Sequence, residues 1–121
     1  MAIRMSLRAS ATLTLLLGLV MWLFNLAITP LIYTHIALAV LVLILSITVL
    51  FLPAPGNVRL FQGVVVLLAI CTMLVGLLQF LSIFDGLPAT ITHLILALAV
   101  VGLIETTLAR QNRIARAARS A

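Results

Sequence analysis

The chain has 121 residues, of which 65% are apolar and only 7% carry a charge, and its mean hydropathy is +1.42. A soluble domain of this length needs a polar exterior, which so few charged residues cannot supply. The composition therefore excludes an ordinary soluble protein and predicts a protein of the lipid bilayer. The net charge of +5 then indicates contact with anionic lipid head groups and not with nucleic acid.

Four apolar segments follow one another, at residues 11–28, 31–52, 60–83 and 89–108. Each is close to the ~20 residues that a helix needs to cross the hydrocarbon core of a membrane. No strand-like alternation is present, and backbone groups in lipid must pair within their own segment, which favours helices. Because the connections are short, the sequence predicts one all-α domain over residues 1–121, a four-transmembrane-helix bundle of up-down-up-down topology.

All seven positive charges are arginines, and they lie before the first segment, between the second and third, and after the fourth. With four spans, these three regions share one side of the membrane. We expect the protein in the inner (plasma) membrane of the cell. The positive-inside rule then places both termini in the cytoplasm. Residues 110–121 are expected to form a basic cytoplasmic tail that continues the fourth helix.

One pattern occurs twice in the chain. The ten residues from Pro30 and the ten from Pro88 both read P-x-x-x-T-H-x-x-L-A, at an offset of 58. The same offset aligns other residues of the first and third segments. We therefore predict a tandem duplication of a two-helix hairpin, with repeats at about residues 10–52 and 60–110.

Glycines within the segments are expected to mark points where two helices approach closely. Gly18 and Gly76 are related by the offset of 58, whereas Gly63 and Gly102 have no glycine at the related position.

The two copies of the pattern contain the only histidines of the chain, His35 and His93. An imidazole within a membrane span needs partners for its nitrogens and is therefore a candidate functional group. The second and fourth helices of such a bundle are diagonal, on the order of 13 Å apart, which suits a porphyrin held between two imidazoles. A bare zinc or copper ion needs further ligands nearby. The sequence thus predicts one haem b, with His35 and His93 as its metal ligands.

Two further pairs of residues accompany the histidines. Thr34 and Thr92 directly precede them and are expected to bind the propionates or to orient the second ring nitrogen. Ala39 and Ala97 follow one turn later and are expected to leave room for the flat ring. A six-coordinate haem iron favours electron transfer over oxygen binding.

The residues from Phe61-Gln62-Gly63 to Gly76, followed by FDGLPATITHLILAL at residues 84–98, resemble the haem A synthase family. Its members show a glutamine near the start of an odd helix, then a leucine-proline step and a histidine that opens a leucine- and alanine-rich helix. The resemblance implies a four-helix unit in which His35 and His93 bind haem b together.

The sequence departs from the catalytic unit of that family. The catalytic unit carries a glutamate three residues before its first histidine, and often a cysteine pair in its first outer loop, whereas this chain has Ile32 at that position and a short loop without cysteine. The resemblance therefore implies the haem b half of such a protein.

The leading expectation is a haem b protein that transfers electrons or serves as a haem-bearing subunit of a respiratory or photosynthetic complex, and not an enzyme. Three alternatives stay open: a pigment protein in which each histidine ligates a chlorophyll-type magnesium, a structural subunit of a membrane complex, and a half-size haem A synthase that acts as a dimer. The expected partners are the bilayer and either other membrane subunits or a second copy of the chain.

Overall fold

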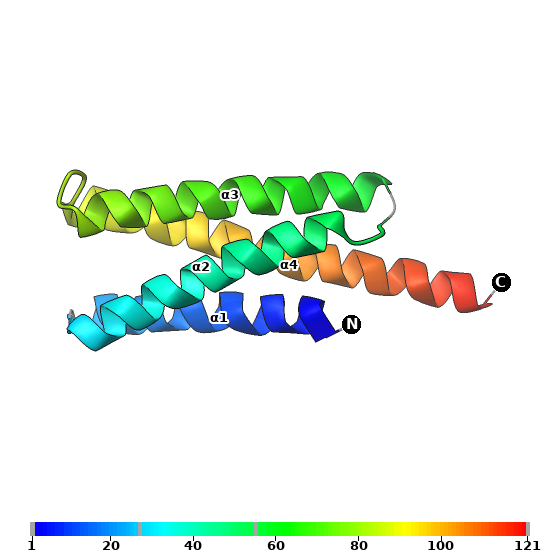
Figure 1. Ribbon diagram of the computed structural model, residues 1–121, viewed down its shortest axis with the longest axis horizontal. Coiled ribbons are helices and arrows are strands. Elements are labelled where there is room, and N and C mark those ends of the chain that lie inside the picture. The colour runs from blue at the N-terminus through cyan, green and yellow to red at the C-terminus, as the bar shows by residue number, and fades with distance from the viewer. Residues whose placement is uncertain (1, 27, 55, 121) are drawn as a thin grey trace.

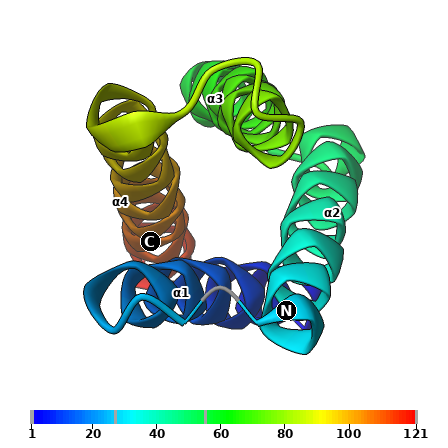
Figure 2. The ribbon, with the colours of Figure 1, turned by 90° about the vertical axis from the view of Figure 1, so that its left-hand side faces the viewer.

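The computed structural model describes residues 2–26, 28–54 and 56–120, the last three by their backbone only. It contains four helices: α1 (Ala2–Leu23), α2 (Thr29–Phe51), α3 (Gly56–Phe80) and α4 (Gly86–Ser120). Successive helices run in opposite directions (Figure 1), and an end-on view shows the four helices arranged as a square, with one helix along each side (Figure 2). Each helix packs against two neighbours, so that α1 lies diagonal to α3 and α2 to α4. The prediction of an all-α, up-down-up-down four-helix bundle is confirmed.

All four helices are long and apolar enough to cross a membrane. Large apolar side chains cover the outside of the bundle, among them Phe51, Leu60 and Ile95, each of which is more than half exposed. Such a surface is unfavourable in water and favourable in lipid. The chain is therefore a multi-pass membrane protein.

The first and third helices end in the same way. A residue in the left-handed conformation follows each of them, Asn25 with φ 52° and Ser82 with φ 55°. Two backbone N–H groups then turn back to the last carbonyls of the helix, which is the Schellman arrangement. These bonds run from Leu26 to Met21 and from Asn25 to Trp22 after α1, and from Ile83 to Leu78 and from Ser82 to Gln79 after α3.

These turns correct the predicted bounds of two segments. The first was expected to reach residue 28 and the third residue 83, but α1 ends at Leu23 and α3 at Phe80. A left-handed residue stops the helical hydrogen bonding even where the sequence stays apolar. At its other end α1 begins at Ala2, because the residues before the apolar segment continue the same helix.

Prolines open the two helices that carry the histidines. Pro30 lies in the first turn of α2, where its missing N–H leaves no helical hydrogen bond unmade. Pro88 takes the corresponding place in α4, two residues after Gly86, whose φ is 77°. Each histidine follows the proline of its helix by five residues, which is little more than one helical turn.

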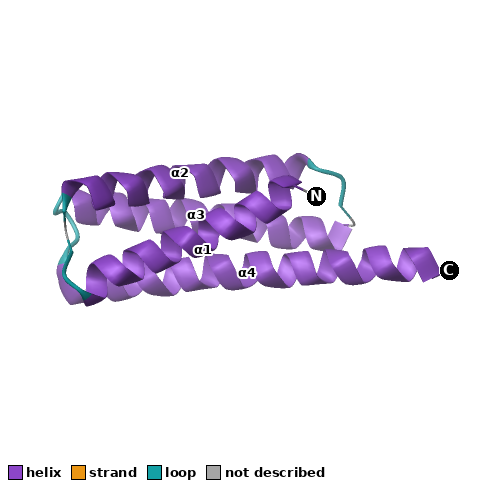
Figure 3. Ribbon diagram, turned by 90° about the horizontal axis from the view of Figure 1, so that it is seen from below, coloured by secondary structure: helices purple, strands orange, loops and turns teal. Residues whose placement is uncertain are grey.

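Both termini and the connection between α2 and α3 lie at the same end of the bundle, and α4 extends beyond the other helices there (Figures 1 and 3). This end holds the arginines, and several of them contact other segments, among them Arg110 of α4, which lies over the ring of Phe61 of α3. Arg8 forms an ion pair with Glu105 between α1 and α4, and Arg4 donates a hydrogen bond to the carbonyl of Pro53. The predicted continuation of the fourth helix through the basic tail is confirmed, since α4 reaches Ser120.

The core is a thin column of small and medium side chains along the bundle axis. Many of its buried positions recur at the offset of 58: the pairs are Leu7 and Val65, Ala11 and Ala69, Val42 and Val100, Ser46 and Ile104, and Val49 and Thr107. The two hairpins therefore turn equivalent positions inward. This agrees with a tandem duplication, which itself stays a prediction.

Candidate functional site

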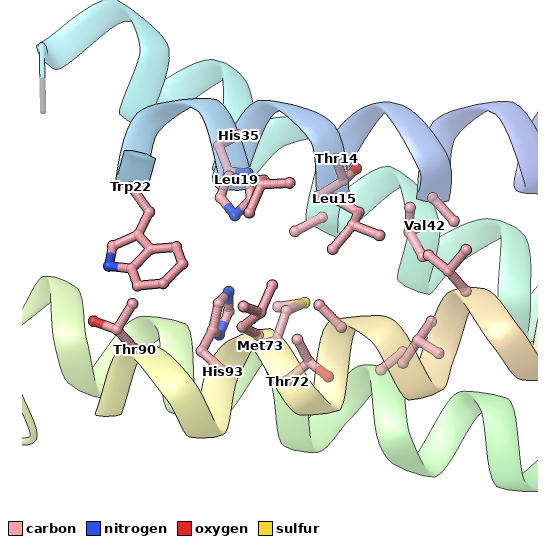
Figure 4. A pocket seen from close by; sticks show the side chains of 18 residues that line it. Thr14, Leu15, Leu19, Trp22, His35, Val42, Thr72, Met73, Thr90 and His93 are labelled. Atoms are coloured by element: carbon pink, nitrogen blue, oxygen red, sulfur yellow. The ribbon is translucent and has the colours of Figure 1, made fainter. Parts of the chain in front are cut away.

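His35 and His93 face one another across the bundle. They lie on the diagonal helices α2 and α4, yet their ring centroids are 6.1 Å apart, with an angle of 59° between the ring planes. Figure 4 shows a nitrogen of each ring pointing toward the other ring. The structure thus brings together the two histidines that the sequence predicted as a pair.

Each imidazole rests against the backbone of the helix that precedes its own. A Cβ atom added at Gly18 would lie 2.8 Å from Cε1 of His35, and one at Gly76 would lie 2.8 Å from Cε1 of His93. These two glycines therefore make room for imidazole rings. Gly63 and Gly102, which were also expected at close helix contacts, have no atom within 4 Å of an added Cβ, so that expectation is wrong.

The Nδ1 atom of each ring is buried without a hydrogen bond. The backbone carbonyl of Thr14 lies toward the ring of His35, and that of Thr72 toward the ring of His93, but neither makes a hydrogen bond to Nδ1 as the side chains stand. A carbonyl in this position orients an imidazole so that its other nitrogen can bind a metal.

The residues predicted to accompany the histidines fall into two groups. Ala39 and Ala97 line the cavity beside the rings. Thr34 and Thr92 are exposed, and their hydroxyls donate to the carbonyls of Pro30 and Pro88 in their own helices. The structure therefore places the alanines at the site and the threonines outside it.

The cavity extends from the histidines toward the middle of the bundle. Most of its walls come from residues related by the offset of 58, with the two alanine pairs and the threonine pair among them (Figure 4). The walls are almost wholly apolar. The volume of this partly open cavity is about 110 Å³, less than the roughly 300–1,000 Å³ of a typical ligand pocket. A large cofactor therefore requires part of the wall to move outward.

The spacing of the rings fits one metal ion between them. With a metal–nitrogen bond of about 2.0 Å and ~1.1 Å more to the ring centre, two imidazoles on opposite sides of a metal have centroids on the order of 6 Å apart. The observed 6.1 Å agrees with this value. The angle between the planes is compatible as well, since each ring can rotate about its metal–nitrogen bond.

In the part of the chain that the structure describes, no His, Cys, Asp or Glu side chain joins the two histidines, and Met73 adds only a weakly coordinating thioether to the cavity wall. Within residues 2–26, 28–54 and 56–120, no three His, Cys, Asp or Glu side chains gather where they could hold a metal ion. Two imidazoles alone make an incomplete site for zinc or copper. A tetrapyrrole supplies the four equatorial ligands itself, so the donor set fits a metal tetrapyrrole.

Sequence reasoning missed Thr14, Thr72 and Trp22 as residues of the site. For the threonines the signal was present, since the offset that relates the histidines also relates Thr14 to Thr72. Trp22 also lines the cavity, as Figure 4 shows. Its counterpart at the offset of 58 is Phe80, so the repeat gave no signal for it.

Comparison with models of known protein families, with curated proteins and with solved structures gave no match. The fold and the site themselves define the class: a four-helix integral membrane protein with a pair of facing histidines in an apolar cavity.

Proposed function

We propose that the chain binds one haem b between His35 and His93, and that it transfers electrons or serves as a haem-bearing subunit of a respiratory or photosynthetic membrane complex. The observation that carries the proposal is the spacing of the rings, whose centroids lie 6.1 Å apart on diagonal helices. Two imidazoles that share one metal ion need about this distance.

When bound, haem supplies a one-electron redox centre, and two histidine ligands leave its iron no open position for a substrate. The chain provides the rest. Gly18 and Gly76 let each ring lie against a helix backbone, which limits its rotation. The carbonyls of Thr14 and Thr72 are placed to accept a hydrogen bond from Nδ1–H, which raises the basicity of Nε2 as a ligand. The apolar walls keep water away from the metal and so contribute to the redox potential.

The distance between the two imidazole rings also disfavours the alternative of a pigment protein. In a pigment protein, each histidine would ligate the magnesium of its own macrocycle. The gap between the rings accommodates one macrocycle plane, and two planes would need several ångströms more. One shared tetrapyrrole is therefore favoured.

The unpaired ring nitrogens bear on the structural alternative. A polar group buried in an apolar site without a partner costs about 1–3 kcal/mol. Nδ1 of His35 and Nδ1 of His93 are both in this state. Donation of Nδ1–H to the carbonyls of Thr14 and Thr72 would remove this cost and orient each ring for a metal at its other nitrogen. Packing alone gives no reason for two imidazoles to face one another in an apolar cavity. A half-size haem A synthase stays a weaker candidate, because Ile32 occupies the place of the glutamate that the family uses.

For the orientation, we propose an inner membrane with both termini in the cytoplasm. The arginine-bearing end of the bundle then faces the cytoplasm, and the histidine pair lies toward the outer surface. Other membrane subunits or a second copy of the chain are the proposed partners.

The test is the absorption spectrum of the purified protein after reduction, with the haem content measured per chain. The expected result is one haem b per chain with a low-spin, cytochrome b-like spectrum. His35→Ala and His93→Ala are each expected to convert the haem to a high-spin form, and free imidazole is expected to restore the low-spin spectrum. A colourless protein that takes up no added haem would refute the proposal, and so would a low-spin spectrum that survives either substitution without imidazole.

A further inference from the structure

The walls of the cavity are not symmetric, although the two hairpins place equivalent residues around it. Helices α1 and α4 each contribute six lining residues, and α2 and α3 contribute three each. Twelve of these eighteen residues form six pairs at the offset of 58, such as Thr14 and Thr72. The remaining six all belong to α1 and α4: Gly18, Leu19 and Trp22, and Thr90, Leu94 and Val101. The cavity therefore extends toward one side of the bundle.

Four side chains show the difference between the two sides. Leu19 of α1 and Leu94 of α4 are half-buried and line the cavity. Their counterparts on the opposite side, Leu77 of α3 and Ile36 of α2, are 51% and 39% exposed and do not line the described part of the cavity. On the α2–α3 side the corresponding side chains are thus more exposed and lie outside the described cavity lining.

The chain connectivity gives a physical reason for this difference. A short connection joins α2 to α3, whereas α1 and α4 are not consecutive and pack least extensively of the four neighbouring pairs. Two unlinked helices with a small contact separate at a lower cost than two linked ones. The α1–α4 contact is therefore where the cavity can widen.

Trp22 lies at the outer end of this contact. Its side chain is 45% exposed, lines the cavity and lies across from Thr90 of α4 (Figure 4). A broad aromatic ring in this place covers the side of the cavity and offers a flat apolar surface to a planar ligand. Its counterpart Phe80 is also half exposed, but it does not belong to the described cavity lining.

We propose that the site opens sideways into the bilayer between α1 and α4, that the tetrapyrrole enters from the lipid by this route, and that Trp22 forms the movable side wall over its edge. This inference rests on the proposed function. It also provides the space for a tetrapyrrole that the cavity of about 110 Å³ lacks, because the cavity widens when Leu19, Trp22 and Leu94 move outward. The route is largely apolar, which suits the apolar macrocycle of a cofactor that enters from the membrane.

The first test closes one helix contact at a time with a short bis-maleimide cross-link. Cys71, the one native cysteine, is first changed to alanine. Leu19→Cys with Leu94→Cys then links α1 to α4. The matched control, Leu77→Cys with Ile36→Cys, links α3 to α2 at the related positions. Haem uptake by the apoprotein in lipid nanodiscs is followed by absorption before and after cross-linking.

We expect the α1–α4 link to slow haem uptake by about tenfold or more and the α2–α3 link to change it by less than about twofold, since a blocked route acts on the rate. Equal effects of the two links, or a larger effect of the control, would overturn the inference. If the unlinked chain takes up no haem, the proposed function fails instead, so the two failures are distinguishable.

A second test needs no cross-link. Trp22→Ala removes the side wall, and Phe80→Ala is its matched control at the related position. Haem loss to an excess of a haem-scavenging protein is expected to be about tenfold faster in Trp22→Ala and nearly unchanged in Phe80→Ala, because a lost covering side chain raises mainly the dissociation rate. Equal rates in the two variants would overturn the role of Trp22.

Discussion

Gly18→Ala places a methyl group 2.8 Å from Cε1 of His35. Ordinary contacts between carbon atoms lie at about 3.5–4.0 Å, so the ring must move by roughly 0.7 Å or more. His35 cannot then keep both its approach to the Thr14 carbonyl and its distance to a metal ion shared with His93. The substitution is therefore expected to weaken haem binding while the bundle stays folded.

Overpacking of this kind costs typically 1–3 kcal/mol. At 1.4 kcal/mol for each factor of ten, haem affinity should fall about 5- to 150-fold. Gly76→Ala, which places a methyl group 2.8 Å from Cε1 of His93, should give a similar loss. The assay is a haem titration of the apoprotein in nanodiscs, followed by absorption.

The chain offers its own controls. An added Cβ at Gly63 or Gly102 has no atom within 4 Å, so Gly63→Ala and Gly102→Ala should leave haem affinity within about twofold, as for a substitution without a clash. If Gly18→Ala binds haem as tightly as these two controls, the ring does not depend on the glycine and the reasoning is refuted.

Three further predictions concern stability, measured by unfolding in detergent. Both side-chain amide atoms of Gln62 are buried and unpaired, so Gln62→Leu should raise the free energy of unfolding by about 1–3 kcal/mol. Gln79→Leu removes a hydrogen bond to Thr90 and should lower it. A change of the same sign in both variants would contradict this reasoning. Ser82→Gly should stabilise by up to about 1 kcal/mol because glycine adopts the left-handed conformation without strain, and a loss of stability would count against the turn. Arg8→Ala should cost no more than about 1 kcal/mol because its ion pair with Glu105 is exposed, and a larger loss would indicate a structural role that the geometry does not support.

The four helices and their order could be predicted from the sequence because lipid leaves the backbone few choices. Apolar segments of about 20 residues must form helices, and short connections make neighbours antiparallel. The ends of α1 and α3 could not be predicted, because the turns at Asn25 and Ser82 arise from left-handed residues within sequence that stays apolar. Hydropathy does not register such a residue.

The histidine pair could be predicted because a repeated polar residue is conspicuous in an apolar chain. Gly18 was expected at a close helix contact, and the structure shows that it receives a ring of α2. The spacing contained a clue, since His35 follows Gly18 by 17 positions and His93 follows Gly76 by the same number. In each antiparallel hairpin, the glycine lies about as far before the turn as the histidine lies after it, and this brings the two residues side by side.

The asymmetry of the cavity could not be predicted. A duplicated hairpin predicts equal walls on both sides, and Trp22 and Phe80 are both aromatic. The difference arises from the packing of whole helices, because the α2–α3 contact is held by a connection and the α1–α4 contact is not.

The most direct measurement of the central claim is the electron paramagnetic resonance spectrum of the oxidised, haem-loaded protein, because it reports the axial ligands of the iron. The account predicts a low-spin ferric signal of the bis-imidazole type that becomes high-spin in His35→Ala and in His93→Ala. A high-spin signal in the unaltered protein, or a low-spin signal that persists when either histidine is removed, would contradict it.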